Sequence, residues 1–117
     1  MDFLWLDIQD TFAFAPKDDN EFSEPYKRAV YTLEVLRLND RDSLLARRRN
    51  AFENYHARLE KYVSGKKLGS PDTLLLKIKK GILTEGHPRV WKEMPRQQQK
   101  VPELAALFQS APEALLW

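Results

Sequence analysis

The sequence predicts a mainly α-helical protein in which an N-terminal β-hairpin packs on a helical hairpin that is followed by short proline-started helices. Apolar residues recur at helical spacing through the middle of the chain, whereas the first fifteen residues carry aromatic side chains with a period of two. Four of the seven prolines follow residue 87 and divide the end of the chain into short segments. Because 117 residues suit one domain and are too few for two ordinary ones, we expect a single domain over residues 1–117.

The first sixteen residues predict a hairpin arm. Phe12 and Phe14 repeat with period two, and the polar pair Gln9-Asp10 indicates a turn between strands at about 2–8 and 11–15. Pro16 and the acidic stretch KDDNE end the arm. A lone hairpin is marginally stable in water, so its aromatic side is expected to pack on helices.

Two helices are expected to form a hairpin over residues 24–63. Ser23 is a good N-cap and Pro25 fits the first turn of the first helix. Asn39 is a candidate C-cap, with Asp40 as the N-cap of the next helix.

The second helix, at about 41–63, carries a nearly heptad-like apolar seam. This seam is either the core of the helical hairpin, which the adjacent first helix favours, or a dimer interface. Its residues are spaced by 7, 3, 4 and 3 positions: Leu45, Phe52, Tyr55, Leu59 and Tyr62.

Short helices that wrap around the hairpin are expected over residues 70–117. Ser70-Pro71 repeats the serine–proline start signal and predicts a helix at about 71–81. His87-Pro88 starts another helix, which Pro95 must kink or restart because proline lacks an amide donor and clashes with the preceding turn. Two later prolines, Pro102 and Pro112, begin the segments ELAALFQS and EALLW.

The charge of the chain is divided unevenly. Residues 1–25 sum to −6, residues 26–100 to +10 and the remainder to −2. This division suggests an acidic flap that folds onto a basic body, a basic face for DNA or RNA, or ordinary solvated helix surfaces. The run Arg47-Arg48-Arg49 lies on the second predicted helix. Consecutive helical residues point in different directions, so these three arginines cannot all face one groove, and Arg48 lies nearest the apolar seam. The candidate phosphate-binding residues are Arg47, Arg48, Arg49, Lys66, Lys67, Lys77, Lys79 and Lys80.

No complete catalytic or metal-binding motif is present in the sequence. The absence of cysteine excludes disulfides, thiolate nucleophiles and cysteine-ligated zinc. His56 and His87 lack paired ligand spacing, and the sequence has neither a GxSxG motif nor a glycine-rich phosphate loop. We therefore expect no catalytic residue, no metal, no cofactor and no enzyme activity of the chain on its own. A metal-dependent nuclease that uses His56 or His87 is the remaining catalytic alternative.

The sequence also bears on localisation. The N-terminus MDFLWLDIQD has neither a basic leader nor a small-residue cleavage site, and no apolar run approaches the ~18–20 residues that cross a bilayer. A soluble, cytoplasmic protein without a membrane partner is expected.

Two stretches resemble one protein family. They are AVYTLEVLRLNDRDSLLARRRNAFENY, which follows the segment FAFAP, and HPRVWKEMPRQQQKVPELAALFQSAPEALLW. The first is similar to the helical region downstream of the nuclease motif in HNH endonuclease-like proteins of bacterial defence systems, of the Septu and retron-associated kind. Leu33 stands where that family usually has isoleucine. The matching positions are Ala29, Thr32, Leu33, Leu36, Leu38, Asn39, Leu44, Leu45 and Arg47 or Arg48.

The resemblance implies a helical module that acts with an HNH-type nuclease or a partner ATPase in antiviral defence. The histidine, asparagine and cysteine pattern of the family's nuclease motif is absent here, so none of its catalytic residues can be assigned. We therefore expect either part of a longer protein or a relative without the nuclease. The alternatives are a protein-only adaptor or regulator that binds a partner or forms a homodimer, and a remnant of a metal-dependent nuclease.

Overall fold

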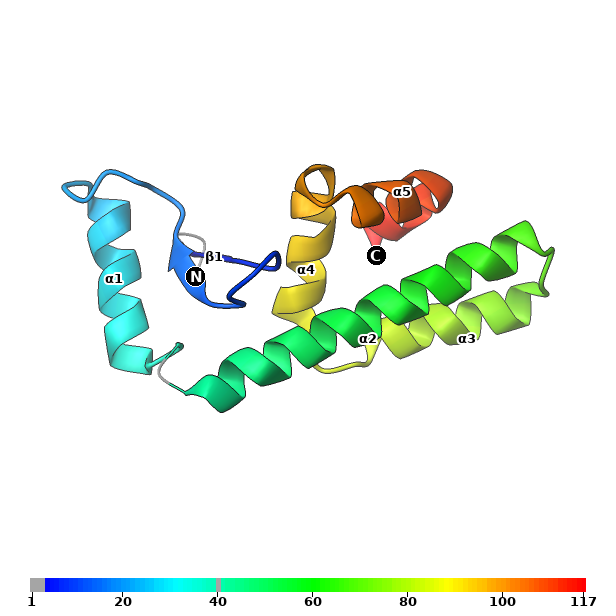
Figure 1. Ribbon diagram of the computed structural model, residues 1–117, viewed down its shortest axis with the longest axis horizontal. Coiled ribbons are helices and arrows are strands. Elements are labelled where there is room, and N and C mark those ends of the chain that lie inside the picture. The colour runs from blue at the N-terminus through cyan, green and yellow to red at the C-terminus, as the bar shows by residue number, and fades with distance from the viewer. Residues whose placement is uncertain (1–3, 40) are drawn as a thin grey trace. The chain divides into compact units, whose positions relative to one another are not determined.

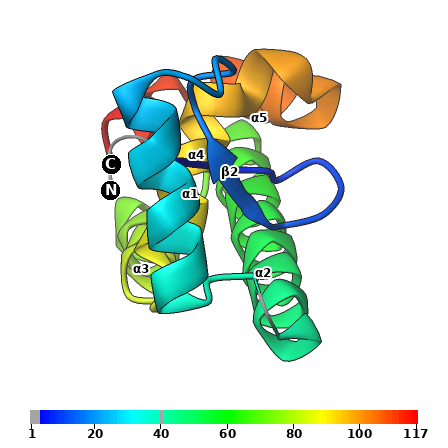
Figure 2. The same cartoon turned by 90° about the vertical axis from the view of Figure 1, so that its left-hand side faces the viewer.

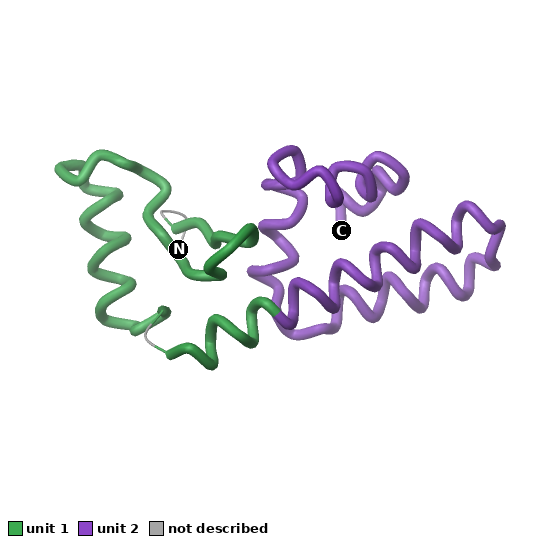
Figure 3. Tube along the Cα trace, viewed as in Figure 1, with its two compact units in different colours: residues 1–49 green, residues 50–117 purple. Residues whose placement is uncertain are grey.

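The computed structural model describes residues 4–39 and 41–117 and confirms the mainly α-helical fold with an N-terminal hairpin (Figure 1). The elements are β1 (Leu4–Leu6), β2 (Phe14–Pro16), α1 (Glu24–Leu36), α2 (Asp42–Lys67), α3 (Asp72–Leu83), α4 (Pro88–Gln97), η1 (Gln98–Lys100), α5 (Pro102–Ser110) and η2 (Pro112–Leu116). The chain divides into two compact units, residues 1–49 and 50–117 (Figure 3). The boundary lies inside α2, so this helix contributes to both units.

The hairpin of unit 1 is shorter than the sequence predicts. Its strands are antiparallel, with Trp5 opposite Ala15, and the predicted strand residues 2 and 3 lie outside the described residues. The Asp7 carboxylate accepts hydrogen bonds from the backbone N–H groups of Gln9, Asp10 and Thr11, at 2.8, 3.3 and 3.1 Å. These bonds hold the chain in a turn and take up amides that a longer strand pair would use.

Partial burial would raise the pKa of the Asp7 carboxyl, but these backbone hydrogen bonds favour its charged form, and the pKa lies below its ordinary value.

Helix α1 begins as the sequence predicts and ends earlier. The Ser23 hydroxyl accepts a hydrogen bond from the Tyr26 N–H at 3.2 Å, and a proline lies in the first turn. The helix ends at Leu36 and its C-cap is Arg37, whose φ of 51° is left-handed, so the prediction of Asn39 as the C-cap is wrong. The side chain of Asn39 bonds to β2 instead, and the predicted N-cap Asp40 lies outside the described residues. Figure 2 shows α1 beside β2, its packing partner within unit 1.

In unit 2, α2 lies antiparallel along α3 (Figures 1 and 2), a pairing that the sequence does not predict. The Arg58 guanidinium of α2 donates a hydrogen bond to the Gly81 carbonyl of α3 at 2.8 Å. Gly65 of α2 lies so close to Leu75 of α3 that a Cβ at this glycine would be 2.9 Å from Leu75 Cδ2. These two contacts fix the antiparallel register. Gly69, with a φ of +72°, makes the tight turn between the two helices. Helix α3 starts at Asp72, one residue later than predicted, and Ser70 makes no side-chain cap.

The core of unit 2 is aromatic. Trp91 of α4 lies 5.6 Å from the Tyr55 ring and 6.0 Å from the Phe108 ring, and Tyr62 meets Trp117 edge to face at 4.9 Å. Three of the seam residues of α2, Tyr55, Leu59 and Tyr62, are buried in this unit. Tyr55 and Leu59 are 1% and 0% exposed and belong to this core.

The proline-started segments of the C-terminal third form as the sequence predicts, with one difference. Pro88, Pro102 and Pro112 each begin a helical segment. Helix α4 continues through Pro95 to Gln97 before it tightens into η1, so it does not restart at Pro95. The buried Glu93 side chain holds the end of this helix: it accepts a hydrogen bond from Gln97 at 3.0 Å and pairs with Arg96 at 3.3 Å.

Candidate nucleic-acid interface

A groove of about 490 Å³ runs between α2 and α3 in unit 2 and is lined by cations but by no carboxylate. Lys61 and Lys77 contribute exposed side chains from opposite helices, and Arg58 contributes a partly exposed one. Between them lie Leu74, Ile78 and small residues such as Gly65. We call this the basic groove; its lining residues are Arg58, Lys61, Ser64, Gly65, Leu68, Ser70, Leu74, Lys77, Ile78 and Gly81.

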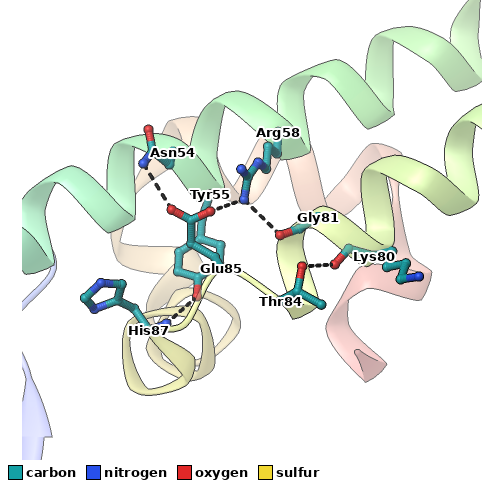
Figure 4. Close-up of polar contacts among 8 residues, drawn as sticks. All are labelled: Asn54, Tyr55, Arg58, Lys80, Gly81, Thr84, Glu85 and His87. Atoms are coloured by element: carbon teal, nitrogen blue, oxygen red, sulfur yellow. Dashed lines mark hydrogen bonds and ion pairs between the residues drawn. The ribbon is translucent and has the colours of Figure 1, made fainter.

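One end of the basic groove is held by a polar network (Figure 4). The Arg58 guanidinium donates to both the Gly81 carbonyl and the Glu85 carboxylate, and the Asn54 amide donates to the same carboxylate at 3.1 Å. In the loop between α3 and α4, the His87 N–H donates to the Tyr55 hydroxyl at 3.1 Å. Glu85 therefore neutralises and positions Arg58, whereas Lys61 and Lys77 have no ion-pair partner among the residues that the structure describes.

The three consecutive arginines have three different surroundings in unit 1. Arg47 is exposed. Arg48 points inward: it donates to the carbonyls of Phe12 and Leu38 and lies 4.5 Å from the centre of the Phe14 ring. Burial lowers the pKa of the Arg48 guanidinium.

Arg49 is exposed but holds the hairpin turn, because it donates to the Asp10 carbonyl at 2.8 Å and lies 5.3 Å from the centre of the Phe12 ring. Among the three arginines, only Arg47 has no contact with the hairpin among those that the structure describes. Arg48, which the sequence includes among the phosphate-binding candidates, is committed to holding unit 1 together.

The predicted lysines also divide. Lys66 pairs with Glu113 at 2.7 Å and donates to the Ser110 carbonyl at 3.2 Å, so it anchors the C-terminal segment. Burial would raise the pKa of Glu113, but the hydrogen bond from Lys66 lowers it below its ordinary value. Lys79 lies 5.3 Å from the centre of the Trp117 ring.

Three predicted lysines remain as exposed charges. Lys77 lines the basic groove, and Lys80 is three residues further along α3, on the same face of that helix. Lys67 is exposed near the end of α2 and lines a different depression, beside His56. The structure thus brings Lys77 and Lys80 together and separates them from Lys66, Lys67 and Lys79.

Sequence reasoning missed Lys61 and Arg58. Both lie on α2 outside the arginine run. Consecutive charges stand out in a sequence, whereas charges one helical turn apart do not. The spacing of 58, 61, 65 and 68 is a helical face, and it identifies these residues once α3 is known to pack beside them.

The two histidines lie in separate surroundings. His56 Nδ1 lies 2.7 Å from Glu60 and its Nε2 lies 3.9 Å from Glu103, while the ring stacks on Phe52. His87 sits at the N-terminus of α4. Within residues 4–39 and 41–117, no group of three or more histidine, aspartate or glutamate side chains is placed to hold a metal ion.

Comparison with known proteins gives no relative: no family model, no curated protein and no solved structure matches the chain. In the part of the chain that the structure describes, none of the helices combines the length and apolar character that a membrane crossing needs.

Proposed function

We propose that this chain is a non-catalytic helical binding module that contacts the phosphate backbone of nucleic acid through the basic groove of unit 2. The observation that carries the proposal is the lining of that groove, in which Lys61 and Lys77 face a shared depression without any carboxylate. Lysines act on phosphate as point charges, so such contacts position a nucleic acid without reading its sequence.

The charge of the whole unit supports the same function. Residues 50–117 carry a net charge of +4, whereas residues 1–49 carry −2. A locally positive surface attracts polyanions and raises their rate of association. The resemblance to the helical region of HNH-type defence nucleases provides a context, in which a binding module holds DNA for a nuclease or ATPase partner.

A salt titration tests the proposal. Fluorescence anisotropy with a labelled DNA duplex is expected to give weak binding at low salt, with an affinity that falls steeply as salt rises. The double variant Lys61→Gln/Lys77→Gln is expected to bind more weakly and to lower the slope of log K against log salt by about one for each lysine.

The matched control is Lys17→Gln/Lys27→Gln, which removes the same charge from exposed positions of unit 1. If the control weakens binding as much as the groove variant does, the effect reflects net charge and the groove has no special role. Absence of binding at low salt, or binding that does not depend on salt, would remove the proposal.

A second candidate is a protein-only adaptor, and the exposed leucines of the α2–α3 pair favour it. Leu68, in the turn after α2, and Leu76 of α3 are 83% and 61% exposed, so both offer apolar surface to a partner. The partner to test is an ATPase or HNH protein encoded next to this chain, if its genome has one. Co-purification with that protein should be lost in Leu68→Asp/Leu76→Asp and kept in Lys61→Gln/Lys77→Gln, whereas the reverse pattern contradicts the adaptor function.

A further inference from the structure

Unit 2 contains another concave surface, which the proposed contact with nucleic acid does not use. It is a cavity of about 560 Å³ on the side of Trp91, with Tyr55 and Trp117 also in its wall. Leu83 and Leu115 line it and remain exposed to water. The volume lies within the roughly 300–1,000 Å³ of ordinary ligand pockets, so it accommodates one aromatic side chain and adjoining backbone.

The polar part of this cavity is positive. Lys92 and Arg96, one turn apart on α4, line it, and no carboxylate does. Arg96 is held at 3.3 Å by the buried Glu93, whereas Lys92 is exposed and has no ion-pair partner in the described part of the chain. The chemistry of the cavity therefore suits an aromatic group that is flanked by negative charge.

Unit 1 presents a segment of that chemistry in the acidic turn, residues 17–24. Its aromatic residue, Phe22, is 77% exposed, and Asp19 and Glu21 beside it are exposed too. The turn is held by its own hydrogen bonds: the Asp18 carboxylate accepts from the Asn20 N–H at 2.9 Å, and the Asn20 side chain accepts from the Phe22 N–H at 3.1 Å. A preorganised turn loses little conformational entropy when it binds.

We propose that the cavity of unit 2 receives Phe22 and its acidic turn from a second copy of this chain. In a dimer with two-fold symmetry each copy offers one turn and one cavity, so the same contact forms twice. The Phe22 ring packs against the tryptophan wall, and Asp19 and Glu21 approach Lys92. The second copy is the occupant of choice because one chain carries both surfaces, with opposite charge and matching apolar content.

The first experiment is sedimentation equilibrium of the full chain over a concentration series. A reversible monomer–dimer equilibrium is expected, and Phe22→Ala should weaken it at least about 30-fold, since an aromatic anchor at the centre of an interface is a binding hot spot. Leu36→Ala is the control, because it removes another exposed apolar side chain of unit 1. A chain that stays monomeric at several hundred micromolar, or a dimer that Phe22→Ala leaves intact, overturns the proposal.

A charge exchange then tests which surfaces meet. One variant carries Asp19→Lys/Glu21→Lys in the acidic turn, and the other carries Lys92→Glu in the cavity; each alone places like charges against each other and should remain monomeric. Mixed together they pair opposite charges at both contacts, so a heterodimer is expected. Formation of the heterodimer supports the proposal, and a mixture that stays monomeric while wild-type protein dimerises contradicts it. Arg96 is left unchanged in this design because it also neutralises Glu93.

Discussion

Replacing Arg48 with alanine should destabilise unit 1 strongly, although Arg48 belongs to a run of arginines that suggests a binding surface. Its guanidinium donates to the carbonyls of Phe12 and Leu38 and to the side chain of Asn39, and it stacks on the Phe14 ring. These groups come from the hairpin and from the segment after α1, so a single side chain ties α2 to both.

The expected cost follows from the number and burial of these contacts. A hydrogen bond that involves a charged group contributes roughly 1.5–3 kcal/mol, and a cation–π contact adds about 0.5–1 kcal/mol. Arg48 is half-buried, and water replaces part of what is lost. The contacts also share one side chain, so their energies are not additive. We expect Arg48→Ala to lower the free energy of unfolding by about 2–4 kcal/mol.

Urea denaturation measures this loss, and native-state hydrogen exchange locates it. The Phe14 amide, which donates to the Asn39 side chain, should exchange faster in Arg48→Ala. Arg47→Ala is the matched control, since Arg47 is exposed, and it should change stability by less than about 0.5 kcal/mol. Equal effects of the two substitutions would refute the inward role of Arg48. Arg48→Lys should not restore stability, because a lysine ammonium cannot reproduce the planar fork of donors.

Two further predictions concern unit 2. Gly69→Ala should destabilise the protein by about 1 kcal/mol and lower its Tm by about 3–5 °C in a thermal melt, because the left-handed φ of +72° disfavours any L side chain. Gly81→Ala, whose Cβ would meet Arg58 at an ordinary 3.7 Å, should instead be neutral or stabilising; a loss as large as that of Gly69→Ala contradicts the argument. Burial and the hydrogen bond to Glu113 raise the pKa of Tyr62 to about 12. The folded chain then keeps a proton that the unfolded chain releases above pH 10, so its free energy of unfolding should fall as pH rises from 10 to about 12. In urea titrations between pH 10 and about 12, Tyr62→Phe should reduce the dependence of the free energy of unfolding on pH. An unchanged dependence contradicts the assignment of this effect to Tyr62.

The helices were predictable from the sequence because their signals are local. Ser23 with Pro25 acts on the residues next to it, as do Pro88, Pro102 and Pro112, and the structure confirms these starts. The seam of α2 was equally readable, since Tyr55 and Leu59 are buried at the predicted spacing. Periodicity identifies a buried face without naming what covers it. It therefore could not show that α3 and α4 pack against this face within unit 2.

The wrong predictions arise where a side chain bonds to backbone groups, nearby for Asp7 and far along the sequence for Asn39. The strands are short because Asp7 collects three backbone amides, and Asn39 is no C-cap because its amide bonds to Phe14, twenty-five residues away. Nothing local distinguishes these residues from ordinary turn formers. The basic groove was missed because Lys61 and Lys77 are neighbours only after α2 and α3 have paired.

The arginine run shows why charge along a sequence is a poor guide to a binding surface. A rotation of about 100° per helical residue sends Arg47 to solvent, Arg48 into unit 1 and Arg49 onto the hairpin turn. Arg48 and Arg49 contact carbonyl oxygens and aromatic faces, so substitutions there would reduce the proposed nucleic-acid binding only by destabilising the fold. The lysines of the basic groove face water across a shared depression, so their removal should change affinity at constant stability. Binding data on this chain therefore need a stability measurement beside each variant, because only a loss of affinity without a loss of folding locates the site.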